Sequence, residues 1–247
     1  MTRFKWNDIL NKNRIKEYKS AKKNFDGRDE FENDYDRILF SASFRRLQDK
    51  AQVFPLEKLD FVRTRLTHSL EVSSIGKSLG MIIGLQLIPL TKGTDDEINF
   101  QMVEEIGNVL SCAGLIHDLG NPPFGHFGEV AIREWFASKL KKNKDGSFYF
   151  KFEEYEFKLE RQEALDLLNF EGNAQGLRIL TKLHFVIDRY GMNLTTGVLN
   201  SIIKYPISSL ELGNKKFGGK KIGYFKAEEN TFNYIVNSTK IGKNRNP

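Results

Sequence analysis

Apolar residues recur at helical spacing along most of the chain. This spacing predicts a helix over Asp36–Phe54 that Pro55 ends. A second helix is predicted from Thr64 to about Leu90, with Thr67 as a possible N-cap. Its buried stripe is predicted to consist of large aliphatic side chains, namely Leu70, Ile75, Leu79, Ile82 and Ile83. A third helix is predicted from Ile98 to about Leu119.

Glycine and proline interrupt this pattern after Leu119, and a short helix is predicted next, from Glu129 to Leu140. The segment 148–160 alternates aromatic and charged residues, which predicts a hairpin strand pattern beside a turn at Asp145-Gly146. We interpret its aromatic residues as one buried face of the hairpin rather than a base-stacking platform; they are Phe148, Phe150, Phe152, Tyr155 and Phe157. Helical structure is predicted again over Arg161–Lys182 and over Phe185–Tyr190. A loop or second hairpin is predicted after Tyr205-Pro206, and no closing element at the end of the chain.

Together these elements predict a mainly α fold with one or two small β-hairpins. The 247 residues, 40% of them hydrophobic, are enough to bury a sizeable core. The single cysteine, Cys112, excludes a disulfide scaffold and is expected to be a buried packing residue. The longest apolar runs fall short of the ~20 residues that span a bilayer, and no secretory signal is visible. We therefore expect a cytoplasmic protein with no membrane association.

Charge is distributed unevenly along the chain. Residues 1–28 and 214–247 each carry a net charge of +6, so the middle carries −6 because the whole chain carries +6. We divide the chain into a basic N-terminal arm (1–33), a central domain (34–205) and a basic, glycine- and lysine-rich segment (206–247). The basic ends are most simply solvated surface, although they would also attract polyanions.

The chain has four histidines, and His117 directly precedes Asp118 at the end of an apolar run. Imidazole and carboxylate together suit a first-row divalent cation, or Mg²⁺ where carboxylates dominate. A buried histidine beside a capping aspartate explains this pair nearly as well.

His68 lies one helical turn from both Arg65 and Glu71, and the Arg65 guanidinium could bind a phosphate through paired hydrogen bonds. A solvated ion pair is the alternative for that segment.

A third histidine, His126, precedes Glu129 by one helical turn in GHFGE. A histidine oriented by a carboxylate is typical of a general acid or base. The alternative is a helix start in which Glu129 interacts with the helix dipole and His126 is incidental. The fourth, His184, is interpreted as an ordinary surface or core histidine.

Four strings carry a family resemblance: FRRLQDKAQVFP, RTRLTHSLEV, HDLGNPPFGHFGE and FEGNAQGLRIL. Their order and spacing resemble those of the bacterial deoxyguanosine triphosphate triphosphohydrolases of the HD-domain phosphohydrolase superfamily, over roughly residues 34–190. The resemblance implies an HD-domain helical fold and hydrolysis of dGTP or other dNTPs to the deoxynucleoside and inorganic triphosphate. It also implies a divalent metal, Mg²⁺ or Mn²⁺.

Carried over by position, the resemblance implies that His68, His117 and Asp118 are metal ligands. It makes His126 the catalytic histidine and Glu129 its partner. It further implies substrate-binding residues: Arg65 near the phosphates, Asn121 beside the metal, and Gln48, Gln52 and Asn173 near the sugar and base.

One part of the family pattern is missing. The family completes its metal site with a further aspartate downstream of FEGNAQ, and no segment here matches it; neither Asp166 nor Asp188 has the expected context. We therefore interpret the central domain as incomplete and the chain as the N-terminal part of a longer protein; the alternative is a degenerate or divergent member of the family. We expect residues 1–247 alone to be poorly soluble or inactive, with exposed apolar surface where a following helix would pack.

Two alternatives to a dNTP triphosphohydrolase stay open. One is an HD phosphohydrolase acting on another nucleotide, and the other is a non-catalytic module that binds a nucleotide or nucleic acid. For the full-length protein we expect a homo-oligomer with a dGTP or dNTP substrate, and single-stranded nucleic acid or a nucleotide effector as a further partner.

Overall fold

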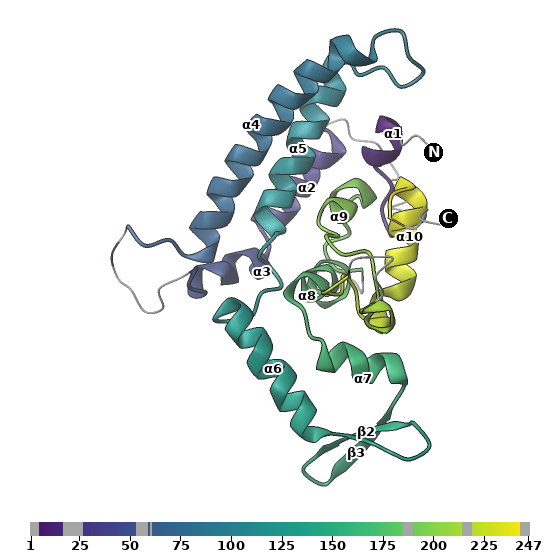
Figure 1. Cartoon of the computed structure of the whole chain (residues 1–247). Coiled ribbons are helices and arrows are strands. Elements are labelled where there is room, and N and C mark those ends of the chain that lie inside the picture. The colour runs from purple at the N-terminus through teal and green to yellow at the C-terminus, as the bar shows by residue number, and fades with distance from the viewer. Residues whose placement is uncertain are drawn as a thin grey trace.

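The computed structural model describes residues 5–16, 27–52, 59, 61–184, 190–213 and 219–242. These residues form α-helices, a few short 3-10 and π turns, and one small sheet (Figure 1). The mainly α class predicted from the sequence is confirmed. The helices are α1 (Trp6–Ile9), α2 (Glu30–Leu39), α3 (Ala42–Arg45), α4 (Arg65–Thr91), α5 (Phe100–Ile116), α6 (Gly125–Lys139), α7 (Arg161–Leu168), α8 (Gly172–Arg178), α9 (Thr196–Ser201) and α10 (Glu229–Thr239). The strands are β1 (Leu140–Lys142), β2 (Phe148–Phe152) and β3 (Tyr155–Leu159).

Helix α5 is the centre of the molecule. It begins at the N-cap Asn99, whose side chain accepts a hydrogen bond from the Met102 amide. Most of its residues are buried, because α4, α2 and α9 pack around it. Figure 1 shows α4 and α5 side by side along their length, with α2 next to them. The C-terminal end of α5 therefore lies beside one end of α4, at the edge of the core.

Small residues let α4 and α5 approach to backbone contact. A Cβ atom added at Gly80 would lie 2.9 Å from the Gly107 Cα atom, and one at Gly114 would lie 2.5 Å from the Ser73 Cα atom. Ser73 and Ser111 share a hydrogen bond of 2.8 Å across the same contact. The distance between the two helices is therefore set at these points by main-chain atoms, while the side chains of Met81 and Val103 pack against Gly107 and Gly84.

This contact overturns the predicted buried stripe of α4. Its buried residues are Arg65, Ser69, Ser73, Gly80 and Gly84, whereas all five predicted aliphatic residues are exposed, from 37% at Leu70 to 60% at Ile75. The large apolar residues of α4 are spread around the helix rather than gathered on the side that packs against α5. Exposed apolar surface was expected, but not from the residues assigned to the core.

By length and composition, helix α4 is also long and apolar enough to cross a membrane. This finding is contrary to the expectation that no segment would be. Of its most apolar 18-residue window, 17% is buried. One helix that meets these measures is weak support for a membrane span. Here one side of α4 packs against α5.

Capping explains why several predicted helix ends are wrong. The segment 36–54 is interrupted because the Ser41 side chain accepts from the Phe44 amide and so starts α3, after α2 has ended at Leu39. Helix α4 is capped by Thr64, which accepts from the Thr67 amide, so Thr67 is not the cap. Helix α6 begins at Gly125, earlier than predicted. The predicted stop at Pro55 lies outside the described residues.

The second half of the chain is more broken than predicted. The helix expected over Arg161–Lys182 is two helices, α7 and α8, followed by a π turn at Ile179–Leu183. Helices α9 and α10 were not predicted, and α10 forms where no closing element was expected. No second hairpin occurs in the described parts of 206–247, and most of the predicted helical stretch Phe185–Tyr190 lies outside the described residues.

The sheet is antiparallel with strand order β1-β2-β3. Phe150 pairs with Phe157, and Phe152 pairs with Tyr155, so these aromatic side chains share one face. The last turns of α6 cover this face at Phe150, through Trp135 and Phe136, and Trp135 also contacts Phe152. Phe152, Tyr155 and Phe157 are 43%, 58% and 51% exposed. Phe148 and Phe150 are only partly buried, so the prediction of a buried aromatic face is wrong.

Candidate metal centre

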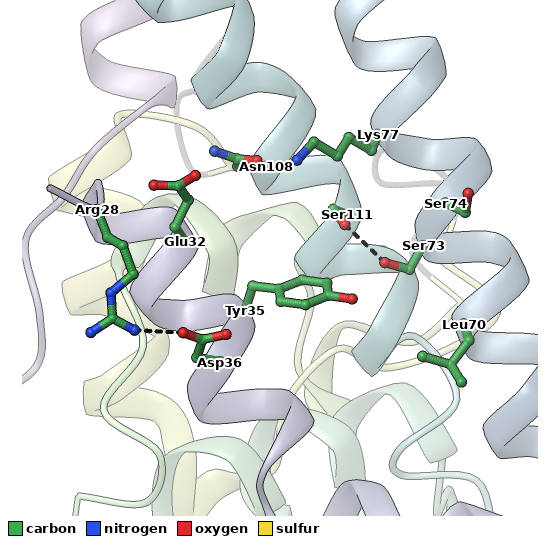
Figure 2. A pocket seen from close by; sticks show the side chains of 10 residues that line it. All are labelled: Arg28, Glu32, Tyr35, Asp36, Leu70, Ser73, Ser74, Lys77, Asn108 and Ser111. Carbon is green, nitrogen blue, oxygen red and sulfur yellow. Dashed lines mark hydrogen bonds and ion pairs between the residues drawn. The ribbon is translucent and has the colours of Figure 1, made fainter.

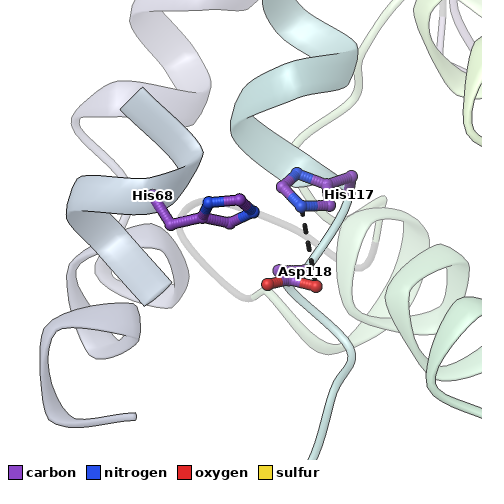
Figure 3. A group of neighbouring side chains, drawn as sticks. All are labelled: His68, His117 and Asp118. Atoms are coloured by element: carbon purple, nitrogen blue, oxygen red, sulfur yellow. Dashed lines mark ion pairs between the residues drawn. The ribbon is translucent and has the colours of Figure 1, made fainter. Parts of the chain in front are cut away.

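His68, His117 and Asp118 come together beside one end of the α4–α5 pair (Figure 3). His68 lies in the first turn of α4, while His117 and Asp118 directly follow α5. One ligand atom from each residue lies within 4.8 Å of the others. The two imidazole rings meet edge to face with their centroids 5.3 Å apart. The convergence expected from the sequence is observed in the geometry.

A hydrogen bond fixes the orientation of the His117 ring. Its Nδ1 atom lies 2.8 Å from the carbonyl oxygen of Gly114, which can only accept. We therefore assign the proton to Nδ1, which leaves the Nε2 lone pair free. Nε2 lies 3.6 Å from Asp118 Oδ1. A ring held by a carbonyl on one nitrogen and free on the other is typical of metal-binding histidines, so these residues fit a divalent cation.

Asp118 is buried and held from two sides. Arg65 donates from Nη1 to Oδ2 at 2.7 Å, and Asn121 donates from Nδ2 to Oδ1 at 2.6 Å. A carboxylate can accept about four hydrogen bonds, so each oxygen keeps capacity for a metal ion. The Arg65 side chain is only 7% exposed. Its observed contact is with Asp118, and its role toward a phosphate stays a prediction.

Lys50 is a neighbour of this site that the sequence did not single out. Its ammonium donates to the carbonyl oxygen of Asn121 at 2.8 Å. Burial, with Arg65 and Arg46 nearby, lowers the pKa of Lys50. Lys50 was part of the string FRRLQDKAQVFP, but nothing in its spacing distinguished it from a surface lysine.

His126 and Glu129 form the predicted pair. His126 Nδ1 lies 2.9 Å from Glu129 Oε2, and the His126 side chain is 80% exposed whereas that of Glu129 is 2% exposed. The other carboxylate oxygen, Oε1, accepts from the Gly172 amide at 2.8 Å. Phe124, just before α6, has a left-handed backbone with φ of 66°. The imidazole therefore projects toward solvent from a rigid, buried carboxylate.

The predicted base and sugar residues make other contacts. Gln48 is exposed and accepts from the Thr64 hydroxyl, and Asn173 donates to Glu171. The Oε1 atom of Gln52 is buried without a hydrogen-bond partner among the described residues. Their contact with a substrate stays a prediction.

Asp166, one of the two candidates for the missing ligand, does not join the cluster. Asp166 is buried in α7, where it accepts from the Lys226 amide at 2.6 Å, and burial raises its pKa. Asp188 lies outside the described residues.

Cys112 is fully buried and burial raises its pKa, as expected for a packing residue. His184 is a core histidine that shares a hydrogen bond with Ser43.

A pocket of about 450 Å³ opens between α2, α4 and α5 (Figure 2). Arg28 and Lys77 line it, as do Glu32 and Asp36, so its formal charges balance. Arg28 donates to Asp36 at 2.5 Å. None of the predicted metal-binding or catalytic residues lines this pocket.

Comparison with known proteins gives a consistent result. Residues 65–193 match the HD domain family. The chain is 50% identical over 245 residues to a deoxyguanosinetriphosphate triphosphohydrolase-like protein of Listeria monocytogenes, which covers 99% of this chain and 51% of that protein. A protein of the same name from Synechocystis is 40% identical over 94% of this chain and 51% of its own length. A deoxyguanosinetriphosphate triphosphohydrolase of Enterobacter is 37% identical over 81% of this chain and 42% of its own length. The chain thus spans about half the length of the curated relatives that it matches.

Proposed function

Because the chain belongs to the HD-domain family, we propose that it is the metal-binding part of a phosphohydrolase that converts dGTP, or another dNTP, to the deoxynucleoside and inorganic triphosphate. The observation that carries this proposal is the convergence of His68, His117 and Asp118 within 4.8 Å, close to the HDLGNPPFGHFGE loop that also presents His126. The names of the relatives support the substrate class.

The metal of this proposal is Mg²⁺ or Mn²⁺. His68, His117 and Asp118 would hold it, with Asn121 beside it. When bound, the cation neutralises negative charge that develops on the α-phosphate. The chain contributes Arg65 and Lys50 as further positive charges around Asp118. This excess of positive charge favours a polyanionic substrate.

The reaction we propose is attack by water on the α-phosphorus. A new oxygen–phosphorus bond forms and the bond from phosphorus to the 5′-oxygen of the sugar breaks, so triphosphate leaves intact. In this reaction His126 acts as a general base that takes a proton from the water, or as a general acid that gives one to the 5′-oxygen. Glu129 orients the ring, since its carboxylate is buried and fixed by the Gly172 amide.

The experiment is product analysis with a panel of ribo- and deoxynucleoside triphosphates and Mn²⁺, using the 247-residue chain beside a longer form of the protein. Anion chromatography should detect triphosphate, and only with deoxynucleotides. Pyrophosphate or orthophosphate as the main anion would contradict the proposal. Metal binding and nucleotide binding without turnover in either form would favour the non-catalytic module. We further propose that the longer form is a homo-oligomer and that it binds a nucleotide or nucleic-acid effector. The same longer form would test both proposals.

A further inference from the structure

Lys50 connects three segments that surround the candidate metal centre. Its ammonium donates to the Asn121 carbonyl oxygen at 2.8 Å, and its own carbonyl oxygen accepts from the Arg65 amide at 3.0 Å. Lys50 follows the 3-10 turn Arg46–Asp49, Arg65 opens α4, and Asn121 closes the turn after α5. The side chain is partly buried, so its contact is shielded from bulk water.

The turn that Lys50 holds is the one that presents Asp118. The Asn121 amide donates to the Asp118 carbonyl oxygen at 3.2 Å, and the Asn121 side chain donates to the Asp118 carboxylate. Asn121 is thus bonded to Asp118 through both its main chain and its side chain. Any movement of the Asn121 peptide would be transmitted to the carboxylate that faces His68 and His117.

We propose that Lys50 is a positioning residue, which holds the Asp118–Asn121 turn so that the Asp118 carboxylate faces the two histidines. The inference takes its metal ion from the proposed function. The role of Lys50 in holding the turn does not depend on that function. Lys50 would act through Asn121 rather than on the ion, because its ammonium and the ion are both positive.

A purely electrostatic role predicts the opposite effect on metal affinity. A cation near the site repels a divalent ion, so removing the charge alone would strengthen binding. Removing a hydrogen bond that orders a ligand would instead weaken binding. Arg46 supplies the matched control, since it lies close enough to affect Lys50 but is exposed and, among the described residues, makes no hydrogen bond to Asn121.

The test compares Lys50→Met, Lys50→Arg and Arg46→Met in the 247-residue chain by amide hydrogen exchange without metal. The Asn121 amide donates to the Asp118 carbonyl oxygen within the turn, and the Leu119 amide donates to the Ile116 carbonyl oxygen where the turn leaves α5, so both report its opening. Loss of a hydrogen bond from a charged donor should speed their exchange by roughly ten- to hundredfold in Lys50→Met. The Leu199 amide in α9 should not change, Lys50→Arg should restore most of the protection, and Arg46→Met should match the wild type.

The second measurement is the Mn²⁺ dissociation constant of the same proteins. Lys50→Met should bind Mn²⁺ several-fold more weakly and Arg46→Met equally or more tightly. Unchanged exchange at Leu119 and Asn121 in Lys50→Met, or Mn²⁺ binding that tightens equally in both variants, would overturn the inference. The exchange measurement requires neither metal nor hydrolysis, so a failed hydrolase proposal and a failed role for Lys50 are distinguishable.

Discussion

The Arg65–Asp118 ion pair offers a direct test of how the candidate site is held together. The two side chains are 7% and 11% exposed and their charged atoms lie 2.7 Å apart. Replacing Arg65 with Met keeps most of the aliphatic packing and leaves Asp118 buried with Asn121 as its side-chain donor. Breaking a buried pair from one side costs about 3–5 kcal/mol, because the remaining charge is no longer compensated.

In a protein of this size, 1 kcal/mol shifts the melting temperature by about 2–4 °C. Arg65→Met should therefore melt roughly 6–20 °C below the wild type when both are measured by calorimetry with a chelator present. Adding excess Mn²⁺ should reduce the difference, since a bound cation replaces the lost positive charge beside Asp118. The double variant Arg65→Met/Asp118→Asn should be more stable than Arg65→Met alone, because it removes the isolated charge.

Two results would refute this reasoning. The first is an Arg65→Met protein that melts within about 2 °C of the wild type, which would mean that Asp118 is well solvated without Arg65. The second is a double variant that is less stable than Arg65→Met, which would mean that packing rather than charge dominates the contact.

Further predictions concern individual residues. His126→Ala should lower the hydrolysis rate by ~10²–10⁴ in whichever length of the protein turns over dNTPs, with Mn²⁺ affinity nearly unchanged; a parallel loss of Mn²⁺ binding would argue against an acid–base role. Gly114→Ala should lower the free energy of unfolding, measured with denaturant, by about 1–3 kcal/mol or more and should also weaken Mn²⁺ binding, because the new Cβ atom would meet the Ser73 main chain. An unchanged free energy of unfolding and an unchanged Mn²⁺ affinity would show that α4 and α5 can separate freely. Burial lowers the pKa of His184, so the unfolded chain binds more protons than the folded protein as the pH falls below about 6.5. The stability due to neutral His184 is therefore present above that pH and lost below it, and His184→Asn should flatten the fall in melting temperature between pH 7 and 5. Cys112 should resist thiol reagents until the protein unfolds, and rapid labelling of the native protein would contradict its burial.

The sequence predicted which side chains come together at the site better than the packing around it. His68, His117 and Asp118 were grouped as metal ligands by the family resemblance, whose strings contain three of the four histidines of the chain. The HDLGNPPFGHFGE string also predicted the His126–Glu129 contact, since a spacing of three places both side chains on one helical face. Such local relations follow from chain geometry alone.

The packing of α4 could not be predicted in the same way. Hydrophobic periodicity identifies an apolar face but not the partner that covers it, and here glycine and serine form the buried contact. Ser41 broke a predicted helix because one side-chain hydrogen bond outweighs the apolar pattern across it. The role of Lys50 was hidden because Asn121 lies far from it in the sequence and only the fold brings them together.

The backbone contact between α4 and α5 has a kinetic consequence. His68 lies in α4 and His117 directly follows α5, and their rings lie edge to face with centroids 5.3 Å apart. Because glycine and serine main-chain atoms limit how closely the helices approach, the spacing of the two rings is set by the contact between the helices. An arriving cation then needs no movement of one helix toward the other, and association is not slowed by a conformational change of the scaffold. The rate of capture should instead follow the rate at which each ion exchanges its bound water, so that Mn²⁺ would load faster than the more slowly dehydrating Mg²⁺.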